Sequence, residues 1–299
     1  MNVISLFNGM GTLRQALNDL NIKVDKYYSS EIKPYAIELQ QHHFKDVIQV
    51  GNIEDWKEWD IDWATIDFIG SGSPCQDLSA AGKRAGINGS RSSLFFVFIE
   101  ILEHVKKLNS NVLFLQENVG SASKKDVGVM SRALGVYPTR INSSLITAQL
   151  RDRYYWTNLK TKSTMFDVVT DIPQPKDKGI ILNDILTSGK SDAKKHTCLN
   201  TGSGTGGTQR YLKHRNETTG MITLIEDKGE FRTCNKIEMC RLQGFPDNYC
   251  DTLKQTKAGS LLGDGWTLPI IIHILSFLKE GKKIKQKECT HETLLEALS

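Results

Sequence analysis

Val3-Ile-Ser-Leu-Phe7-Asn8-Gly9-Met10-Gly11 is an apolar run that ends in a glycine-containing turn. The run has the character of a buried strand, and an amphipathic helix is expected after it, from about residue 12 to residue 20. Glycines between a strand and a helix let a ligand approach the backbone, where the first N–H groups of the helix are unpaired. The turn is shorter than the dinucleotide-binding fingerprint, so by itself it fits a tight turn as well as a ligand site.

Strands and helices alternate through the first half of the chain. Further strands are expected at residues 24–30, 47–50, 65–69 and 111–119, with helices between them. A helix is then expected from about residue 124 to residue 134, followed by a strand over residues 139–148. This spacing is typical of parallel βαβ units and predicts an α/β fold with a doubly wound, mostly parallel sheet. In such a sheet, ligands bind beyond the carboxyl ends of the strands.

Candidate site residues follow several of these strands. Glu31 comes after the second strand, where a carboxylate can accept hydrogen bonds from both ribose hydroxyls of an adenosine; a surface glutamate that caps the next helix is the alternative. Asn52 follows the third strand, and Glu117 ends a predicted central strand. Cys75 follows a stiff Ser-Pro turn, although an isolated cysteine is more often a small buried hydrophobe.

The middle of the chain contains two further features. Arg151 and Arg153 project to the same side of an extended chain, which suits binding of a carboxylate or a phosphate; a structural ion pair is the alternative. Residues 76–93 are small, glycine-rich and basic without periodicity, as in functional lids. Residues 160–230 include a glycine run that lacks the ending of a phosphate loop and fits either a groove-probing recognition segment or a surface linker.

The amino-acid composition is that of a soluble globular protein. The 299 residues are 39% hydrophobic and 24% charged, which is ordinary for a soluble globular protein. The net charge of +4 combines an acidic excess in residues 1–103 with a basic excess in the remainder, which fits either a polyanion-binding surface or a solvated basic face. The cysteine spacing argues no zinc site, and no signal-type segment or bilayer-length apolar run is seen, so we expect a cytosolic protein.

Four motifs in one order carry a family resemblance: Ser73-Pro-Cys75, Glu117-Asn-Val119, Gln149-Leu-Arg151-Asp-Arg153 and Arg241-Leu-Gln-Gly-Phe-Pro246. Over residues 3–159 and 231–279 the chain resembles the cytosine-C5 DNA methyltransferases, and its first half is most similar to the catalytic domain of the vertebrate de novo enzymes. The resemblance implies a Rossmann-like class I methyltransferase that uses S-adenosylmethionine. It divides the chain into a first catalytic part (1–159), a small irregular target-recognition region (160–230), a return to the catalytic domain that ends in a helix (231–280) and a charged tail (281–299).

The resemblance also implies roles for individual residues. Cys75 would add to C6 of a cytosine flipped out of double-stranded DNA, Glu117 would hydrogen-bond N3 and the exocyclic amine, Arg153 would hold O2, and Arg151 would support the site. The residues implied in S-adenosylmethionine binding are Phe7, Gly9, Met10, Gly11, Glu31, Ile32, Asn52, Ile53, Pro74, Asp264 and Trp266. The residues implied in DNA binding are Ser79, Lys83, Arg84, Arg91, Arg210, Lys213 and Arg215. No metal and no membrane is implied, the oligomeric state is open, and the location would be the cytoplasm of a bacterial or phage-infected cell.

Three positions depart from the family pattern, and two rival functions remain. Asn52 replaces the usual aspartate, but its amide oxygen can still accept from the adenine amino group. Asp264 lies in a varied motif, and Ser73 replaces a common second proline, as in the de novo branch.

One rival function is that of a transfer-RNA cytosine methyltransferase of the same family, although the Cys-Phe-Thr tripeptide of that branch is not seen. The other is a catalytically silent DNA-binding homologue, which would lack the cysteine or the cofactor glycines.

Overall fold

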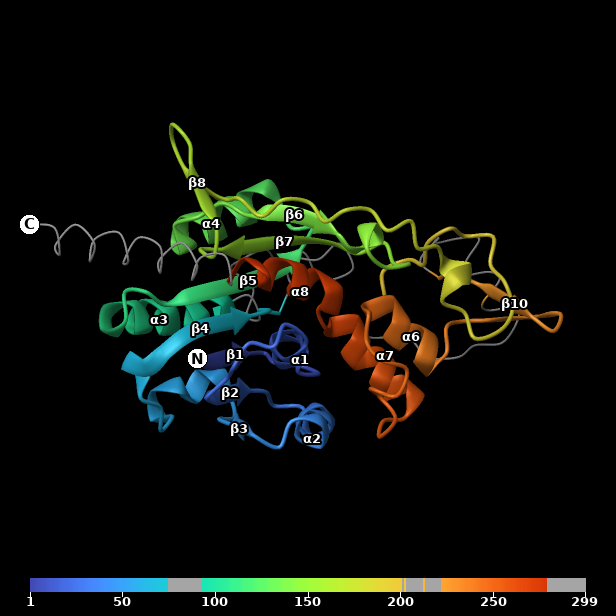
Figure 1. The fold of residues 1–299 in the computed structure, drawn as a ribbon, viewed down its shortest axis with the longest axis horizontal. Coiled ribbons are helices and arrows are strands. Elements are labelled where there is room, and N and C mark those ends of the chain that lie inside the picture. Colours follow the sequence, from blue (N-terminus) through green and yellow to red (C-terminus); the bar gives the residue numbers. More distant parts are fainter. Residues whose placement is uncertain (75–92, 201, 203–211, 213–221, 279–299) are drawn as a thin grey trace, which may run out of the picture.

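A seven-stranded sheet forms the centre of the molecule (Figure 1). The computed structural model describes residues 1–74, 93–200, 202, 212 and 222–278. The strands of the sheet are β1 (Asn2–Leu6), β2 (Lys26–Ser30), β3 (Val47–Gln49), β4 (Ile66–Ser71), β5 (Leu113–Val119), β6 (Thr139–Asn142) and β7 (Asp152–Thr157). Their order is β3-β2-β1-β4-β5-β7-β6. The first five are parallel, and β7 pairs antiparallel with both β5 and β6, which confirms the predicted mostly parallel sheet.

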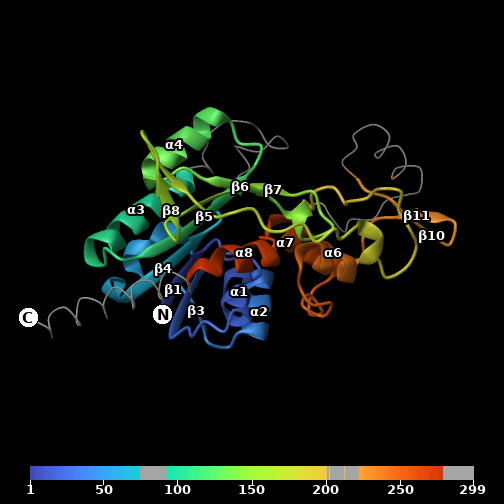
Figure 2. The ribbon, with the colours of Figure 1, turned by 45° about the horizontal axis from the view of Figure 1, so that its top comes forward.

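Helices cover both faces of the sheet (Figure 2). The helices are α1 (Thr12–Asp19), α2 (Pro34–His43), α3 (Ser93–Leu108), α4 (Lys124–Leu134), α6 (Lys236–Gln243), α7 (Gln255–Asp264) and α8 (Leu268–Leu275). One hydrophobic core includes residues of α1, α2 and α8, and another includes residues of α3 and α4. Val3 belongs to the first core and its neighbour Ile4 to the second, because successive side chains of a strand point to opposite faces. The sheet is therefore doubly wound, as predicted.

Of the helix and the strand expected after β5, the helix is observed and the strand only in part. The predicted helix at residues 124–134 is α4, which Ser123 caps by accepting a hydrogen bond from the N–H of Asp126. A strand is expected over residues 139–148, but β6 ends at Asn142. The reason is local, because the Asn142 side chain accepts from the N–H of Ser144 and caps a 3₁₀ turn, η3 (Ser143–Leu145). The strand prediction is wrong beyond that residue.

Helix α7 has no counterpart among the predicted elements, because its glycines resemble turn residues. Gly263 is required by packing, since a Cβ at this position would overlap the backbone of Asn200. Together α7 and α8 form a segment, Gln255–Leu275, whose length and composition alone would allow a membrane span. The segment breaks between the two helices, and most of it is buried inside the protein, as in the core helices of soluble proteins.

The later part of the chain adds small elements around the sheet. These are β8 (Thr161–Ser163), β9 (Val168–Thr170), η4 (Leu182–Asp184), β10 (Ile225–Asp227) and β11 (Glu230–Arg232). Hairpin β8–β9 projects at the top of Figure 1, whereas β10 and β11 lie at the opposite end of the molecule. Buried Glu238 of α6 connects β11 to the segment after η4, because it accepts hydrogen bonds from Arg232 at 2.7 and 2.8 Å and from the N–H of Thr187 at 2.9 Å.

Candidate active site

A cavity of about 380 Å³ lies at the carboxyl ends of β1, β2, β4 and β5, where the fold predicts a ligand site. This volume is within the range of small-molecule pockets, about 300–1,000 Å³. The predicted site residues that line it are Phe7, Gly9, Glu31, Ile32, Asn52, Ile53, Pro74, Glu117, Arg151, Arg153, Asp264 and Trp266. Residues from opposite ends of the chain therefore share one cavity.

The turn after β1 has a backbone conformation that glycine favours. Gly9 has a φ of +56° and Gly11 a φ of +83°, and even Phe7 has a φ of +55°. Gln40 of α2 holds the turn in place, because its Nε2 donates to the carbonyl of Gly9 at 2.6 Å. Asn8 is tied to β2 by a hydrogen bond to the hydroxyl of Ser29 at 2.9 Å. Sequence reasoning missed Gln40 and Asn8, because both act through residues distant in the chain.

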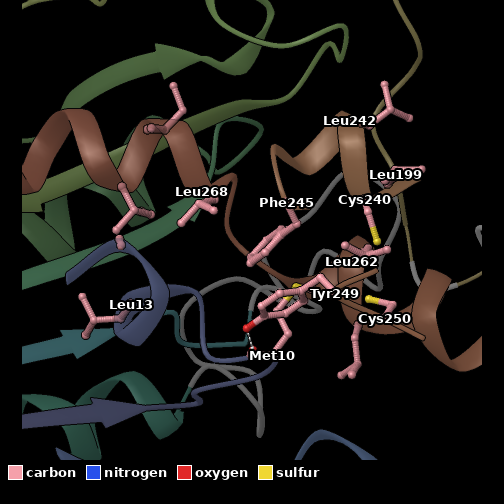
Figure 3. Close-up of a cluster of buried hydrophobic side chains, with 14 of the residues drawn as sticks. Met10, Leu13, Leu199, Cys240, Leu242, Phe245, Tyr249, Cys250, Leu262 and Leu268 are labelled. Carbon is pink, nitrogen blue, oxygen red and sulfur yellow. Dashed lines mark hydrogen bonds between the residues drawn. The ribbon is translucent and has the colours of Figure 1, made fainter. Parts of the chain in front are cut away.

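Met10 differs from its expected role in the pocket. Its side chain is fully buried and packs in the hydrophobic core beside Tyr249, whose hydroxyl donates to the Met10 carbonyl at 2.8 Å (Figure 3). Gly11 is also outside the cavity lining, and a Cβ there would contact Gln40 and Phe44 at 3.5 Å. These two residues therefore shape and anchor the turn, and Phe7 and Gly9 face the cavity.

Glu31 is 8% exposed and is held by backbone donors. Its Oε2 accepts from the N–H of Gly9 at 2.7 Å, and its Oε1 accepts from the N–H groups of Ile32 and Lys33, each at 2.9 Å. A carboxylate offers about four acceptor positions. One position therefore remains for a ligand. The helix-capping alternative is not realised, because the N–H groups of Ile32 and Lys33 precede the first residue of α2 and no side chain caps that helix.

Two of the departures from the family pattern have visible partners. The Asn52 amide accepts from the N–H of Glu54 at 3.3 Å and donates to its carboxylate at 3.2 Å, so it caps the 3₁₀ helix η1 (Ile53–Glu58). Asp264 pairs with Lys33 Nζ at 2.8 Å, and both side chains are about two-fifths exposed. This ion pair links the end of α7 to the segment between β2 and α2 at the cavity. Exposed pairs contribute only about 0–1 kcal/mol to stability, so its main effect is geometric.

Glu117, at the carboxyl end of β5, is a second carboxylate that lines the cavity. Arg153 Nε lies 2.9 Å from its Oε1, and the indole N–H of Trp266 donates to its Oε2 at 3.0 Å. The indole fits because Gly72 has no side chain; a Cβ there would lie 2.7 Å from Trp266 Nε1. Both oxygens of Glu117 are thus oriented by the protein, one from β7 and one from the segment between α7 and α8.

Ser73, the third departure, ties the end of β4 to β5. Its hydroxyl accepts from Gln116 Nε2 at 2.9 Å and from Asn118 Nδ2 at 3.4 Å. Gln116 and Asn118 flank Glu117 in the sequence, so they share its strand. Ser73 and Pro74 line the cavity, and the hydrogen bonds from β5, the strand of Glu117, hold Ser73 in place.

The two arginines have different partners. Arg153 forms an ion pair with Glu117 of the same chain, which is the structural alternative that the sequence left open. Arg151 is buried and donates to the carbonyls of Leu199, Gly263 and Gly265 at 3.2, 3.1 and 2.7 Å. Burial lowers the pKa of the Arg151 guanidinium, and the positive charge of Arg153 lowers it further. Arg151 therefore joins the region 160–230 to the α7–α8 segment, and it does not bind a carboxylate among the described residues.

Several predicted site residues fall outside the described part of the chain. They are Cys75, Ser79, Lys83, Arg84, Arg91, Arg210, Lys213 and Arg215. In the part that the structure describes, no group of three or more His, Cys, Asp or Glu side chains could hold a metal ion. The observed cavity thus combines a glycine turn, a carboxylate bound by backbone N–H groups, Glu31, and a carboxylate with a partner on each oxygen, Glu117.

Comparison with known proteins identifies the family. Residues 1–201 match the family model described as C-5 cytosine-specific DNA methylase. The chain is also 30% identical to the type II methyltransferase M1.ScrFI of Lactococcus lactis subsp. cremoris, over 94% of this chain and 79% of that protein. The chain belongs to the C-5 cytosine-specific DNA methylases. The predicted resemblance is confirmed.

A further relative and a solved structure show likeness in sequence and in fold, respectively. The type II methyltransferase M.NlaX of Neisseria lactamica is 24% identical over 93% of the chain and 96% of its own length. The solved structure of the Entamoeba histolytica methyltransferase EhMeth has a TM-score of 0.67 at 18% identity, covers 94% of the chain and 98% of its own, and shows the shared fold. This methylase is accordingly an enzyme that transfers a methyl group from S-adenosylmethionine to C5 of cytosine in DNA.

Proposed function

We propose that Cys75 is the nucleophile of this methyltransferase and that Glu117 and Arg153 hold the target cytosine. The observation that carries the proposal is that Glu117, oriented through both oxygens, shares one cavity with Pro74, the residue before Cys75, and with Glu31 and the glycine turn. Nucleophile, base-binding carboxylate and cofactor site must adjoin for methyl transfer, because reacting atoms have to come within about 3–3.5 Å of each other.

The residue types follow from the reaction. An aromatic carbon such as C5 is a poor nucleophile until something adds across the ring. The Cys75 thiolate forms a bond to C6, and the electrons of the C5–C6 double bond are delocalised over C5, C4 and N3. Glu117 in its protonated form donates a hydrogen bond to N3 and so stabilises the negative charge there. After methylation, removal of the C5 proton and elimination break the bond to sulfur and free Cys75. Arg153 holds O2 and keeps Glu117 in position.

The described residues fit S-adenosylmethionine, which supplies an electrophilic methyl group when bound. Glu31 retains an acceptor position for a ribose hydroxyl, and the backbone of Phe7 and Gly9 is open to the cavity. Ile32 is 69% exposed although it lines the cavity, as expected for an apolar residue that a flat base would cover. We assign the adenine to Ile32, Asn52 and Ile53, and the amino-acid end to Trp266 and Asp264.

The remaining assignments complete the proposal. Because a cytosine stacked in a duplex is out of reach, the enzyme flips it out of double-stranded DNA. Residues 160–230 form the recognition region between the catalytic parts 1–159 and 231–280, and the tail is 281–299. The predicted DNA contacts remain those named from the sequence. Bacterial relatives named type II methyltransferases support a modification role in the cytoplasm of a bacterial or phage-infected cell.

The test uses Cys75→Ser and a matched control, Cys234→Ser, at a buried core cysteine. With labelled cofactor and duplex DNA, Cys75→Ser should lose methylation and covalent trapping on 5-fluorocytosine DNA but keep DNA binding in a mobility-shift assay. Cys234→Ser should keep all three. Normal methylation by Cys75→Ser would refute the assignment, and transfer of label to transfer RNA in place of duplex DNA would favour the RNA rival.

A further inference from the structure

Cys198 is a cysteine beside the proposed catalytic residues for which the mechanism has no use. Its sulfur lies 3.3 Å from Arg151 Nη1 and 3.7 Å from Arg153 Nη2. The residue comes from the region 160–230, whereas both arginines come from the catalytic part of the chain. A sulfur that contacts two guanidinium groups is placed to fix their separation and orientation.

The position of this sulfur matters because the positive charge of Arg151 is buried without a carboxylate beside it in the described part of the chain. The Arg151 side chain is buried, and among the described residues no carboxylate lies within ion-pair distance of it. Its acceptors are three carbonyl groups and the sulfur of Cys198. A buried cation requires compensation by hydrogen bonds or by an anion, and a thiolate is the nearest group that could provide a charge.

The electrostatics of the cluster agree with this geometry. Burial raises the pKa of the Cys198 thiol, but the positive charges of Arg151 and Arg153 outweigh it and lower the pKa overall. By contrast, burial raises the pKa of Cys234, and the negative charge of Glu238 raises it further. In its neutral form Cys198 can donate to the Leu199 carbonyl at 3.3 Å, so the sulfur has a partner in either state.

The contacts of Cys198 complete a closed chain of interactions that includes Glu117. Arg153 connects Cys198 to one carboxylate oxygen of Glu117. On the other side, Arg151 connects Cys198 to the carbonyl of Gly265, and the next residue, Trp266, donates to the second oxygen. The members of this closed chain, in order, are Glu117, Arg153, Cys198, Arg151, Gly265 and Trp266.

We propose that Cys198 is a positioning residue of the active site, whose sulfur sets Arg151 and Arg153 so that Arg153 and Trp266 hold Glu117. The proposal rests on the function proposed above for Glu117. It connects the recognition region to catalysis, because a shift of the segment around Cys198 would move Arg153 relative to Glu117. Cys198 itself touches neither the cytosine nor the cofactor in this scheme.

The experiment compares variants with and without a hydrogen-bond acceptor at position 198. We expect Cys198→Ala to lower kcat about tenfold, a change of about 1.4 kcal/mol in activation free energy, with KM for S-adenosylmethionine within about twofold. Cys198→Ser, which keeps an acceptor, should recover most of kcat. Cys234→Ala, which removes a buried thiol outside the site, should lower the melting temperature and leave kcat unchanged.

Other outcomes decide against the proposal. Wild-type kcat in Cys198→Ala would overturn it, as would an equal loss in Cys198→Ser or in Cys234→Ala, because these would indicate packing alone. If Cys198→Ala does not fold, the isosteric pair Cys198→Thr and Cys198→Val replaces it, and equal kcat in the pair overturns the proposal. Covalent trapping on 5-fluorocytosine DNA should persist in Cys198→Ala, so a failure here remains distinct from a failure of Cys75 as the nucleophile.

Discussion

Trp266 donates its indole N–H to Oε2 of Glu117 at 3.0 Å, although 149 residues separate them. The other oxygen, Oε1, faces Arg153 at 2.9 Å. Two donors on different oxygens define the plane of the carboxylate before any substrate arrives. A residue that the sequence assigns to the cofactor thus also orients the group proposed to bind the cytosine, which connects the two halves of the site.

Trp266→Phe should lower kcat about tenfold, because it removes one donor to Glu117 and keeps an aromatic ring over Gly72; the change corresponds to about 1.4 kcal/mol in activation free energy. Steady-state methylation kinetics measure it. Trp59→Phe is the matched control, since Trp59 Nε1 is buried with no hydrogen-bond partner among the described residues. Equal kcat values for the two variants would show that the indole hydrogen bond has no catalytic effect.

Gly72→Ala should destabilise the protein and reduce activity together. The new Cβ would lie 2.7 Å from Trp266 Nε1, so the indole must move away from Glu117. Overpacking of this kind costs about 1–3 kcal/mol of unfolding free energy, which denaturant titration can measure. Gly128→Ala in α4 is the control: its Cβ would meet Arg132 Nη1 at 3.4 Å, and an alanine there should raise helix stability by about 0.5–1 kcal/mol. A neutral Gly72→Ala would contradict the packing argument.

Substitutions of Asn52 test whether its amide oxygen binds S-adenosylmethionine. Asn52→Leu removes both the amide oxygen and the cap of η1, so Kd for S-adenosylmethionine should rise about tenfold, as for a loss of about 1.4 kcal/mol. Asn52→Asp keeps an acceptor and the cap but faces the Glu54 carboxylate, so we expect Kd within about threefold of the original. Calorimetry in the absence of DNA separates binding from catalysis. An unchanged Kd in Asn52→Leu would remove Asn52 from the cofactor site.

Glu238 should make the unfolding free energy of the protein decrease at acidic pH. Burial raises the pKa of this carboxyl, but hydrogen bonds from Arg232, Thr187 and Asn235 outweigh burial and lower it. A lowered folded-state pKa contributes stability above the unfolded value of about 4.5, and this stability is lost as the pH falls through the folded pKa. Glu238→Gln should therefore lower the unfolding free energy at pH 7 by about 1–3 kcal/mol and flatten its decline below pH 4.5. An identical pH dependence in both proteins would rule out this role.

The ends of the strands show which parts of the site could be predicted from the sequence. Periodicity locates β1, β2 and β5, so the placement of Glu31 and Glu117 at one edge of a parallel sheet follows before any coordinates are known. The same reasoning fails at β6, where the cap made by Asn142 ends the strand, and at α7, where Gly263 is present for a contact with Asn200. In both cases a specific side-chain or backbone contact outweighs the local pattern.

The sequence by itself determined the fold class and the family, because alternating apolar strands, helices and ordered motifs are local properties of the chain. Only the tertiary structure decided that Met10 belongs to the core, that Ser73 is bound by the neighbours of Glu117, and that Trp266 and Arg153 orient the same carboxylate. These relationships join residues far apart in the chain through contacts of about 3 Å. Packing of helices against the sheet sets such distances, and no spacing along the chain encodes them.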